Sequence, residues 1–254
     1  MKSHVPIADC HGHIGVHPDF PAYKVGPEDM IQVMDLLNIE VLAITSTRAC
    51  YTDCPRGNAE IHDVLNRFPK RFRGYITVNP RPQGEALQEL ERWSDFHRPP
   101  LIKLHPYLHR YPVSGEGYRP VWDYAHQTGG GVLVHTWDSD PACSPLLLLK
   151  VARDYPKARI IMGHSGVTWN GYLQALEVGQ QTDNTYLDIT GSQSHRTVLE
   201  LLVNRVGAER ILFGSDMPYL EAGASLGRVL TARISDGAKE AILRSNFMRL
   251  LGEL

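Results

Sequence analysis

Short apolar runs alternate with longer amphipathic segments along the chain, and this pattern repeats eight times. The apolar runs are rich in β-branched residues and leucine, which is typical of buried strands, and each precedes a turn and a segment with helical spacing. The predicted strands are Ile7 to His13, Val41 to Ser46, Phe72 to Asn79, Leu101 to Leu104, Val132 to His135, Arg159 to Gly163, Thr185 to Asp188 and Ile211 to Gly214. No gap between them is long enough for a second domain, so we expect one domain over residues 1–254.

Helices are predicted between the strands. Pro27 occupies a first-turn position of a segment that ends at Leu37, and the acidic residues Glu28 and Asp29 suit the positive end of the helix dipole. The last predicted helix runs from Ser235, its N-cap, to Leu251, and we expect it on the outside of the fold. Further helices are predicted to start near Asn58, Gly84, Pro120, Ser144, Asn170, His195 and Ala224.

Eight strand–helix units in 254 residues predict the α/β class and a single (β/α)8 TIM barrel. A doubly wound sheet would normally carry a glycine-rich phosphate loop after its first strand, and the sequence contains neither a GxGxxG nor a GKS/T loop. In a barrel, the C-terminal ends of all strands form one face. Side chains at these ends therefore meet in space however far apart they lie in the sequence.

Composition and charge narrow the classes of partner. The chain is 43% hydrophobic and 21% charged, and its formal net charge of −2 provides no electrostatic footprint for nucleic acid or an anionic membrane. The longest leucine run, Leu146 to Leu149, is far shorter than the roughly 20 residues that span a bilayer, and the N-terminus lacks a signal-peptide core. We expect a soluble cytoplasmic protein that acts on a small molecule, with a homo-oligomer as the default assembly.

Cysteine is sparse, so a disulfide framework is not expected. Cys50 and Cys54 have the spacing C-x3-C, which is compatible with the start of a zinc site, but no second Cys or His pair follows at finger spacing. Two incidental thiols in a loop are the better interpretation.

Metal-competent side chains stand at the ends of four predicted strands. Asp9, His11 and His13 alternate with other residues, so all three project from one face of an extended strand. The strands that end near His135, His164 and Asp216 each finish an apolar run with an imidazole or a carboxylate. Imidazoles plus one carboxylate, with an open position for water, suit a catalytic divalent ion. Asp9 is predicted to orient a ligand histidine through the other ring N–H.

Together these residues resemble the amidohydrolase superfamily, in its amidohydrolase-related branch that includes aminocarboxymuconate-semialdehyde decarboxylase. The resemblance covers nearly the whole chain. It implies that His11, His13, His135 and Asp216 hold one divalent metal ion and that His164 lies beside it as an acid/base or electrophilic residue. The motifs that carry the resemblance are Asp9-Cys-His-Gly-His13, Ile102-Lys-Leu-His-Pro106, Val134-His135-Thr136, Met162-Gly-His164 and Phe213-Gly-Ser-Asp-Met-Pro218.

Lys103 is open to two interpretations. In some relatives a lysine at this strand is carboxylated and bridges two metals, so Lys103, His135 and His164 are candidates for a second site. The Lys-Leu-His-Pro sequence resembles the mononuclear branch more closely, in which Lys103 stays an ammonium that faces the substrate or a carboxylate. One metal ion is therefore the favoured expectation. Zinc is the expected ion, and manganese, iron or cobalt suits the same ligands.

The remaining candidates concern substrate binding. Arg48 either binds a substrate carboxylate through its planar guanidinium or is a solvated loop residue. His105 either contacts substrate or anchors the loop that starts at Pro106. Asn79 and Tyr107 occupy comparable strand ends, and Trp137 either walls a pocket or packs in the ordinary way. Surface or capping positions are predicted for His4, His17, His62, His97, His109, His126 and His195.

Metal-dependent hydrolysis of an amide, ester or lactone is the first functional hypothesis, with Asp216 moving the proton of the attacking water and His164 stabilising the oxyanion. The alternative is non-oxidative decarboxylation of a small carboxylic acid, in which Arg48 or Lys103 serves a substrate carboxylate. A metal-dependent nuclease resembling the TatD group, or a barrel that has lost its chemistry, is a third class. The balanced charge argues against a nuclease, and the full set of ligand residues argues against a barrel that has lost its chemistry.

Overall fold

The strands in the centre of the molecule are parallel and short, and nearly all of their residues are buried. The computed structural model describes residues 4–22, 26–81, 84–96 and 100–254. Within that part of the chain the strands are β1 Ile7–Ile14, β2 Ile39–Ser46, β3 Phe72–Gly74, β4 Ile76–Thr77, β5 Leu101–Leu104, β6 Gly131–His135, β7 Arg159–Gly163, β8 Thr185–Asp188 and β9 Ile211–Leu212.

The strands form a closed ring in chain order. The ladder pairs β1, β2 and β3 in one sheet and β4 to β9 in another. The two sheets are joined where the Tyr75 N–H donates to the Ile44 carbonyl at 3.0 Å. At the other seam, the Cys10 N–H donates to the Phe213 carbonyl at 2.9 Å, and the Asp216 N–H donates to the His11 carbonyl at 2.8 Å. The predicted (β/α)8 barrel is thereby confirmed.

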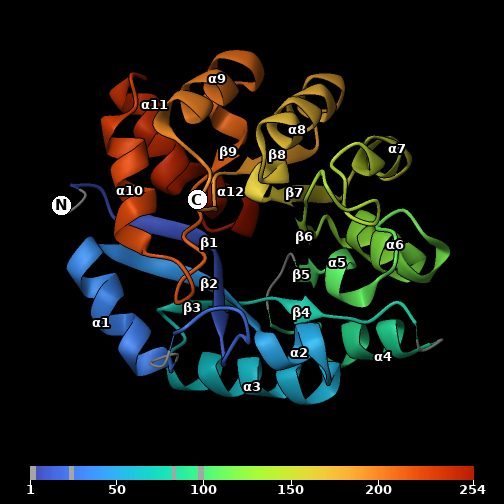
Figure 1. The fold of residues 1–254 in the computed structure, drawn as a ribbon. Helices are drawn as coiled ribbons and strands as arrows, with labels where there is room; N and C mark the ends of the chain where they lie inside the picture. The colour runs from blue at the N-terminus through green and yellow to red at the C-terminus, as the bar shows by residue number, and fades with distance from the viewer. Residues whose placement is uncertain (1–3, 23–25, 82–83, 97–99) are drawn as a thin grey trace.

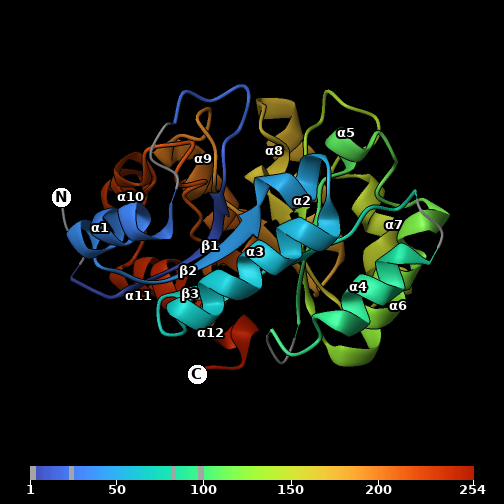
Figure 2. The ribbon, with the colours of Figure 1, turned by 90° about the horizontal axis from the view of Figure 1, so that it is seen from below.

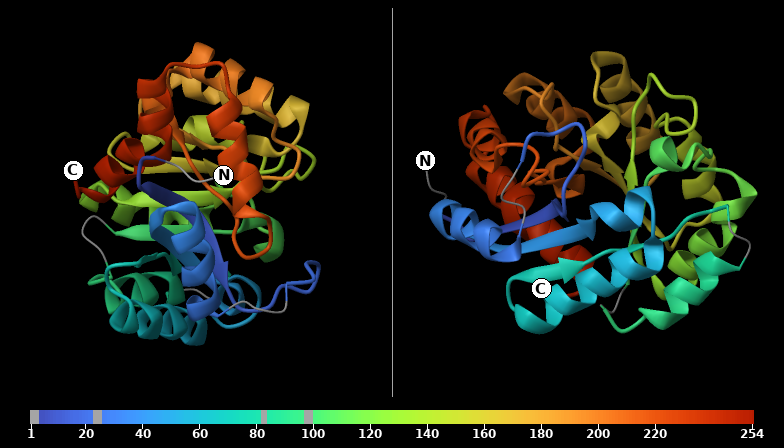
Figure 3. Two further views of the ribbon diagram at one scale, coloured as in Figure 1. Left: turned by 90° about the vertical axis from the view of Figure 1, so that its left-hand side faces the viewer. Right: turned by 60° about the horizontal axis from the view of Figure 1, so that its bottom comes forward.

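Helices surround the strands on the outside (Figures 1 and 3). The helix predicted from Pro27 to Leu37 is confirmed, and the others begin within a few residues of their predicted starts. The outer helices are α1 Pro27–Leu37, α3 Cys54–Arg67, α4 Glu85–Arg92, α6 Arg119–Thr128, α7 Leu147–Asp154, α8 Trp169–Gln181, α9 Arg196–Val206, α10 Ala222–Thr231 and α11 Asp236–Glu240. A last helix, α12 Asn246–Leu251, follows them in the chain. Two short helices, α2 Thr47–Tyr51 and α5 Pro106–His109, follow β2 and β5 directly. No helix in the described ranges is long and apolar enough to cross a membrane.

Two expectations need correction. The single strand predicted over Phe72 to Asn79 is divided at Tyr75, whose buried side chain turns into the barrel and donates to the Cys10 carbonyl at 2.8 Å. The helix that starts at Ser235 is interrupted by a π-helical turn over Ala241–Ser245. Its last part, α12, packs Phe247 against the barrel interior rather than on the outer ring. Figure 2 shows α12 at one end of the barrel and α5 at the other.

Candidate metal centre

His11, His13 and Asp216 meet at the C-terminal end of the barrel. The two histidines lie in β1, and Asp216 follows β9 across the closing seam. The His13 Nε2 atom lies 2.9 Å from Asp216 Oδ1, and the His11 Nε2 atom lies 3.7 Å from the same oxygen. All three side chains are buried, and one ligand atom from each lies within 4.8 Å of the others. Among the described residues this is the one group of three or more metal-competent side chains that is so compact.

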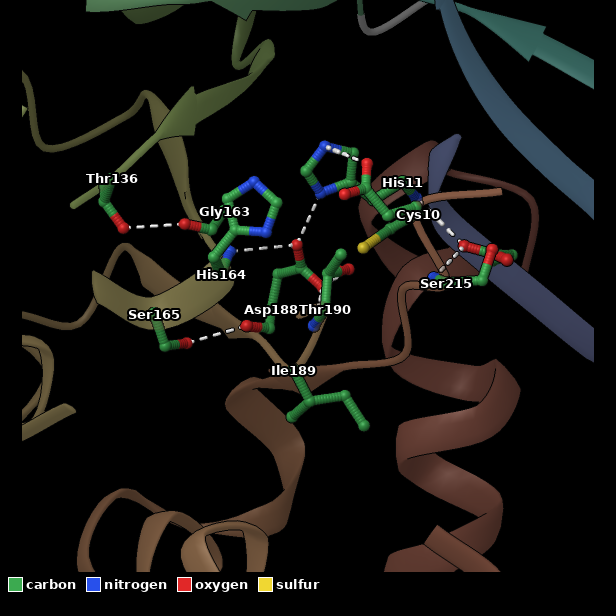
Figure 4. Close-up of polar contacts among 12 residues, drawn as sticks. Cys10, His11, Thr136, Gly163, His164, Ser165, Asp188, Ile189, Thr190 and Ser215 are labelled. Atoms are coloured by element: carbon green, nitrogen blue, oxygen red, sulfur yellow. Dashed lines mark hydrogen bonds and ion pairs between the residues drawn. The ribbon is translucent and has the colours of Figure 1, made fainter. Parts of the chain in front are cut away.

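Asp188, at the end of β8, fixes the orientation of His11 (Figure 4). Its Oδ2 atom lies 2.7 Å from His11 Nδ1 and accepts the His164 backbone N–H at 3.3 Å. Its Oδ1 atom accepts the Thr190 N–H at 2.9 Å and the Thr190 hydroxyl at 2.6 Å. Burial raises the pKa of Asp188, but the His11 hydrogen bond and the neighbouring imidazoles lower it further, and the net shift is downward. An ionised Asp188 holds the proton of His11 on Nδ1 and leaves the lone pair of Nε2 directed at the cluster.

The predicted role of Asp9 therefore belongs to Asp188. Asp9 Oδ1 accepts the backbone N–H groups of His11 at 3.0 Å and of Ser215 at 3.1 Å, whereas the hydrogen bond of the His11 ring nitrogen Nδ1 goes to Asp188. Burial raises the pKa of Asp9 to about 7. Asp9 thus ties β1 to the segment that carries Asp216, and its effect on the site is to place both of these ligand residues.

His164 enters the site from a tight left-handed turn after β7. The φ angles of His164, Ser165 and Val167 are +63°, +47° and +68°, values that are costly for residues with a Cβ atom. Neighbouring side chains hold the turn: the Thr136 hydroxyl donates to the Gly163 carbonyl at 2.7 Å, and the Ser165 hydroxyl donates to the Asp188 carbonyl at 2.8 Å (Figure 4). The result is an imidazole whose centroid lies 4.9 Å from that of His11.

Lys103 is fully buried beneath the cluster. Its Nζ atom lies 2.9 Å from His11 Nε2, and burial lowers its pKa. Because Asp188 fixes the proton of His11 on Nδ1, the contact with Lys103 is a hydrogen bond that the amine donates to the lone pair of Nε2. A metal ion would need the same lone pair, so ion and amine compete for one atom.

His135 and His105 form a stacked pair on the wall of the same pocket. Their ring centroids are 4.1 Å apart with an interplanar angle of 14°, and the His135 centroid lies 4.8 Å from that of His164. Burial and the neighbouring imidazoles hold the pKa of His135 well below its usual range, so the ring is neutral and competent as a ligand. In this arrangement His135 stands beside the three-residue cluster rather than within it.

The pocket around these residues has a volume of about 190 Å³. An adjoining cavity of about 230 Å³ has Tyr107 and Trp137 in its wall, together with His105 and His135. The structure thus brings most of the predicted site residues to one continuous concavity. They are His11, His13, Lys103, His105, His135, His164 and Asp216 in the inner part, with Tyr107 and Trp137 in the outer part.

Two substrate-binding candidates lie elsewhere. The guanidinium of Arg48 is half exposed, lies 2.6 Å from Glu60 Oε1 and lines a different cavity. The Asn79 side chain accepts the Arg81 N–H at 3.0 Å and lines none of these cavities.

Two of the histidines that were expected at surface or capping positions, His17 and His109, are located differently. His97, from the same group, lies outside the described residues. His17 lines both the inner and the outer cavity, and His109 is buried with its Nδ1 atom 2.6 Å from the Tyr118 hydroxyl. No periodicity in the loop after β1 marks His17, so the sequence offered no means of finding it. Asp188, in contrast, lies at the end of a predicted strand, and this position marks it as a candidate site residue.

All four cysteines are free and buried. Cys50 lies in α2 and Cys54 begins α3, so neither is in a loop as expected. Cys50 lines the inner pocket, and neither thiol belongs to the metal-competent cluster among the described residues.

Comparisons with known proteins identify the family and agree with the fold. The sequence profile of the amidohydrolase family matches residues 8–252. A solved TIM-barrel protein from Bordetella bronchiseptica superposes with a TM-score of 0.80 at 19% identity, covering 97% of this chain and 98% of that one. A dihydroxybenzoic acid decarboxylase from Polaromonas sp. JS666 with bound manganese gives 0.76 at 17% identity, covering 98% and 97%. A "putative 2-pyrone-4,6-dicarboxylic acid hydrolase" from Pseudomonas putida gives 0.76 at 18% identity, covering 99% of each chain. At such identities these structures establish the fold alone.

Proposed function

Because the chain belongs to the amidohydrolase family, we propose that it is a metal-dependent hydrolase that cleaves an amide, ester or lactone bond of a small molecule. The observation that carries the proposal is the convergence of His11, His13 and Asp216 on one point of a pocket into which His164 also projects. This donor set, two imidazoles and a carboxylate, fits a catalytic divalent ion, and Asp188 directs the lone pair of His11 toward it.

The proposed ligands are His11, His13 and Asp216, with His135 as the fourth because it lines the same pocket. A divalent ion held there would polarise a substrate carbonyl and lower the pKa of water. Zinc is the proposed ion, and manganese, iron and cobalt suit the same donors.

Asp216 and His164 have separate roles in the proposed reaction. Burial raises the pKa of Asp216, but the His13 hydrogen bond and the nearby imidazoles lower it further, so the net pKa lies well below its usual range and the carboxylate is ionised. Its oxygen that does not contact His13 is free to accept a proton from the attacking water and return it to the leaving group. Burial lowers the pKa of His164, so its neutral ring can donate a hydrogen bond to the developing oxyanion.

Decarboxylation of a small carboxylic acid is the second candidate, and the position of Lys103 is the observation that favours it. Lys103 lines the inner pocket and places an amine where a substrate carboxylate would enter. Arg48, the other cation considered for this role, is paired with Glu60 in a different cavity.

One preparation tests both candidates. Protein purified without added metal or chelator is analysed for metal, with about one equivalent expected. Lactones, esters and amides are then screened by acid release, and carboxylic acids by release of carbon dioxide. We expect hydrolysis in the first group, with turnover lowered by about 10² to 10⁴-fold in His164→Asn while the metal is retained. Carbon dioxide release without hydrolysis would instead establish the second candidate, and absence of metal even after reconstitution would overturn both.

A further inference from the structure

The outer half of the pocket contains a pair of hydrogen-bonded polar side chains, His17 and Tyr51, that are not among the proposed metal ligands. Six residues line both the inner and the outer cavity: His17, Tyr51, His105, Leu108, His135 and Val167. Tyr51, in α2, stands at this junction and is 36% exposed, whereas His11, His13 and Asp216 line the inner cavity alone and are buried. A substrate whose reactive group faces the metal donors would therefore direct its far end toward Tyr51.

His17 and Tyr51 form a hydrogen-bonded pair whose donor and acceptor can be assigned. The Asp19 backbone N–H donates to His17 Nδ1 at 3.1 Å, so that nitrogen carries the lone pair. The proton of the neutral ring is then on Nε2, which lies 2.8 Å from the Tyr51 hydroxyl oxygen and donates to it. Edge contacts with Phe20 and Tyr219, at centroid distances of 4.8 and 5.1 Å, hold the His17 ring in this orientation.

The hydroxyl proton of Tyr51 is consequently left for another acceptor. Its oxygen already accepts from His17, and no residue in the described ranges accepts its proton. Burial raises the pKa of Tyr51 to about 12, so the proton is present at neutral pH. Tyr219 differs, because its hydroxyl donates to the Gly15 carbonyl at 3.0 Å and also contacts Thr47. Tyr51 therefore offers the pocket a donor whose direction is set by His17.

The charges around this donor decide which acceptor suits it. Asp19, with a side chain that is 80% exposed, lines the outer cavity and places a carboxylate there. Lys103 belongs to the inner end, where it contacts His11, and the Arg48 guanidinium is turned to Glu60. A carboxylate at the outer end of a substrate would meet the negative charge of Asp19, whereas a carbonyl, ether or hydroxyl oxygen would not.

We propose that the outer half of the pocket binds an uncharged oxygen of the substrate, with the Tyr51 hydroxyl as its donor and His17 as the residue that positions Tyr51. This inference rests on the proposed function only in assigning the reactive group to the metal donors. A pocket of this kind favours substrates that carry an uncharged oxygen at the end remote from the reacting carbonyl.

Binding of unreactive probes tests this without requiring turnover. The metal-loaded protein is titrated by calorimetry with 3- and 4-methoxybenzoate, with the 3- and 4-ethylbenzoates that match them in shape, and with isophthalate and terephthalate. We expect the better methoxybenzoate to bind about 3- to 10-fold more tightly than its ethyl partner, the contribution of one neutral hydrogen bond. We expect the dicarboxylate of the same geometry to bind most weakly.

Variants separate the hydrogen bond from the shape of the pocket. Tyr51→Phe should bring the methoxy-to-ethyl ratio close to one while ethylbenzoate affinity stays within about twofold. His17→Phe should reduce the ratio although Tyr51 is present. Tyr107→Phe, which removes a hydroxyl from the outer wall that has no His17 partner, should keep the ratio of the wild type.

The outcomes are distinct from those of the hydrolase test. A ratio near one in the wild type, a ratio retained in Tyr51→Phe, tightest binding of a dicarboxylate, or no binding of either methoxybenzoate would each overturn the inference. Any of these results can occur whether or not the protein hydrolyses a substrate. Conversely, the expected ratios would stand even if turnover proved to be decarboxylation.

Discussion

Replacing Asp188 by Asn tests how a residue that is not itself a proposed ligand controls the proposed metal centre. The two carboxylate oxygens of Asp188 accept from donors on opposite sides: His11 Nδ1 and the His164 N–H at Oδ2, and the Thr190 N–H and hydroxyl at Oδ1. An asparagine has one acceptor atom and one donor group in these places. It therefore cannot satisfy both sides.

Both orientations of the amide weaken the site. If its oxygen faces His11, the tautomer survives, but a neutral hydrogen bond replaces a charge-assisted one at 2.7 Å, and the NH2 group meets the Thr190 N–H. If its NH2 faces His11, the ring must place its proton on Nε2, where the ion would bind. Loss of such an outer partner costs about 10- to 100-fold in metal affinity, or about 1.4 to 2.8 kcal/mol.

The assay is competition for Zn²⁺ and Mn²⁺ against a chromogenic chelator, with thermal unfolding measured on the same samples. Asp53→Asn is the matched control, because Asp53 caps α3 through the Arg56 N–H, and Asn caps a helix equally well. Asp216→Asn, which removes a ligand, should lose more affinity than Asp188→Asn. If folded Asp188→Asn binds both ions within about threefold of the wild type, the tautomer argument is wrong.

Three further predictions follow from single contacts. Lys103→Met removes the amine that lies 2.9 Å from His11 Nε2, so it should tighten the binding of one ion by about tenfold or more, measured by the same competition. Gly171→Ala would place a Cβ atom 1.9 Å from the Gly166 carbonyl oxygen, so it should lower stability by about 1 to 3 kcal/mol in thermal unfolding. Burial raises the pKa of Cys50 to about 11, so at pH 8 about 0.1% is thiolate, and iodoacetamide should modify it at least 100-fold more slowly than a free thiol, as measured by mass spectrometry.

Each of these has a control and a contradicting result. Loss of metal in Lys103→Met would support a carboxylated lysine that bridges two ions. Gly223→Ala is the matched helical glycine, since nothing lies within 4 Å of its added Cβ atom, and equal stabilities of the two alanine variants would contradict the packing argument. Urea-unfolded protein should be alkylated at every cysteine, and equally rapid labelling of native Cys50 would show that the pocket opens.

The barrel and the convergence of most candidate site residues were predictable because strand ends converge in this fold. His11, His164 and Asp216 come from strands far apart in sequence, and their meeting follows from one geometric rule about the C-terminal face. The assignment of Asp9 failed for a local reason. The pairing of β1 with β2 shifts register between Asp9 and Gly12, so a strict alternation of faces does not hold at the residues where it was applied.

The other differences arise from packing that no local pattern encodes. Tyr75 divides a strand because its ring fills the barrel beside the small side chains of Ala8 and Ala43. The C-terminal helix α12 closes the barrel because Phe247 and its neighbours are buried, which a helical apolar stripe does not distinguish from packing on the outer ring. His17 reaches the pocket through an irregular loop, where neither periodicity nor a strand end marks a position.

The two ring nitrogens of His11 link Asp188, Lys103 and the proposed metal site. Its Nδ1 atom is held by Asp188, which leaves Nε2 as the position that can change partner, and Lys103 now occupies that lone pair. An ion that bound His11 at Nε2 would have to displace the amine, and Lys103 lines the inner pocket. We therefore expect metal binding to free the Lys103 amine for a substrate carboxylate. A carboxylate ligand should accordingly bind Lys103→Met more weakly only when metal is present, whereas an equal loss without metal would show that the amine never depended on His11.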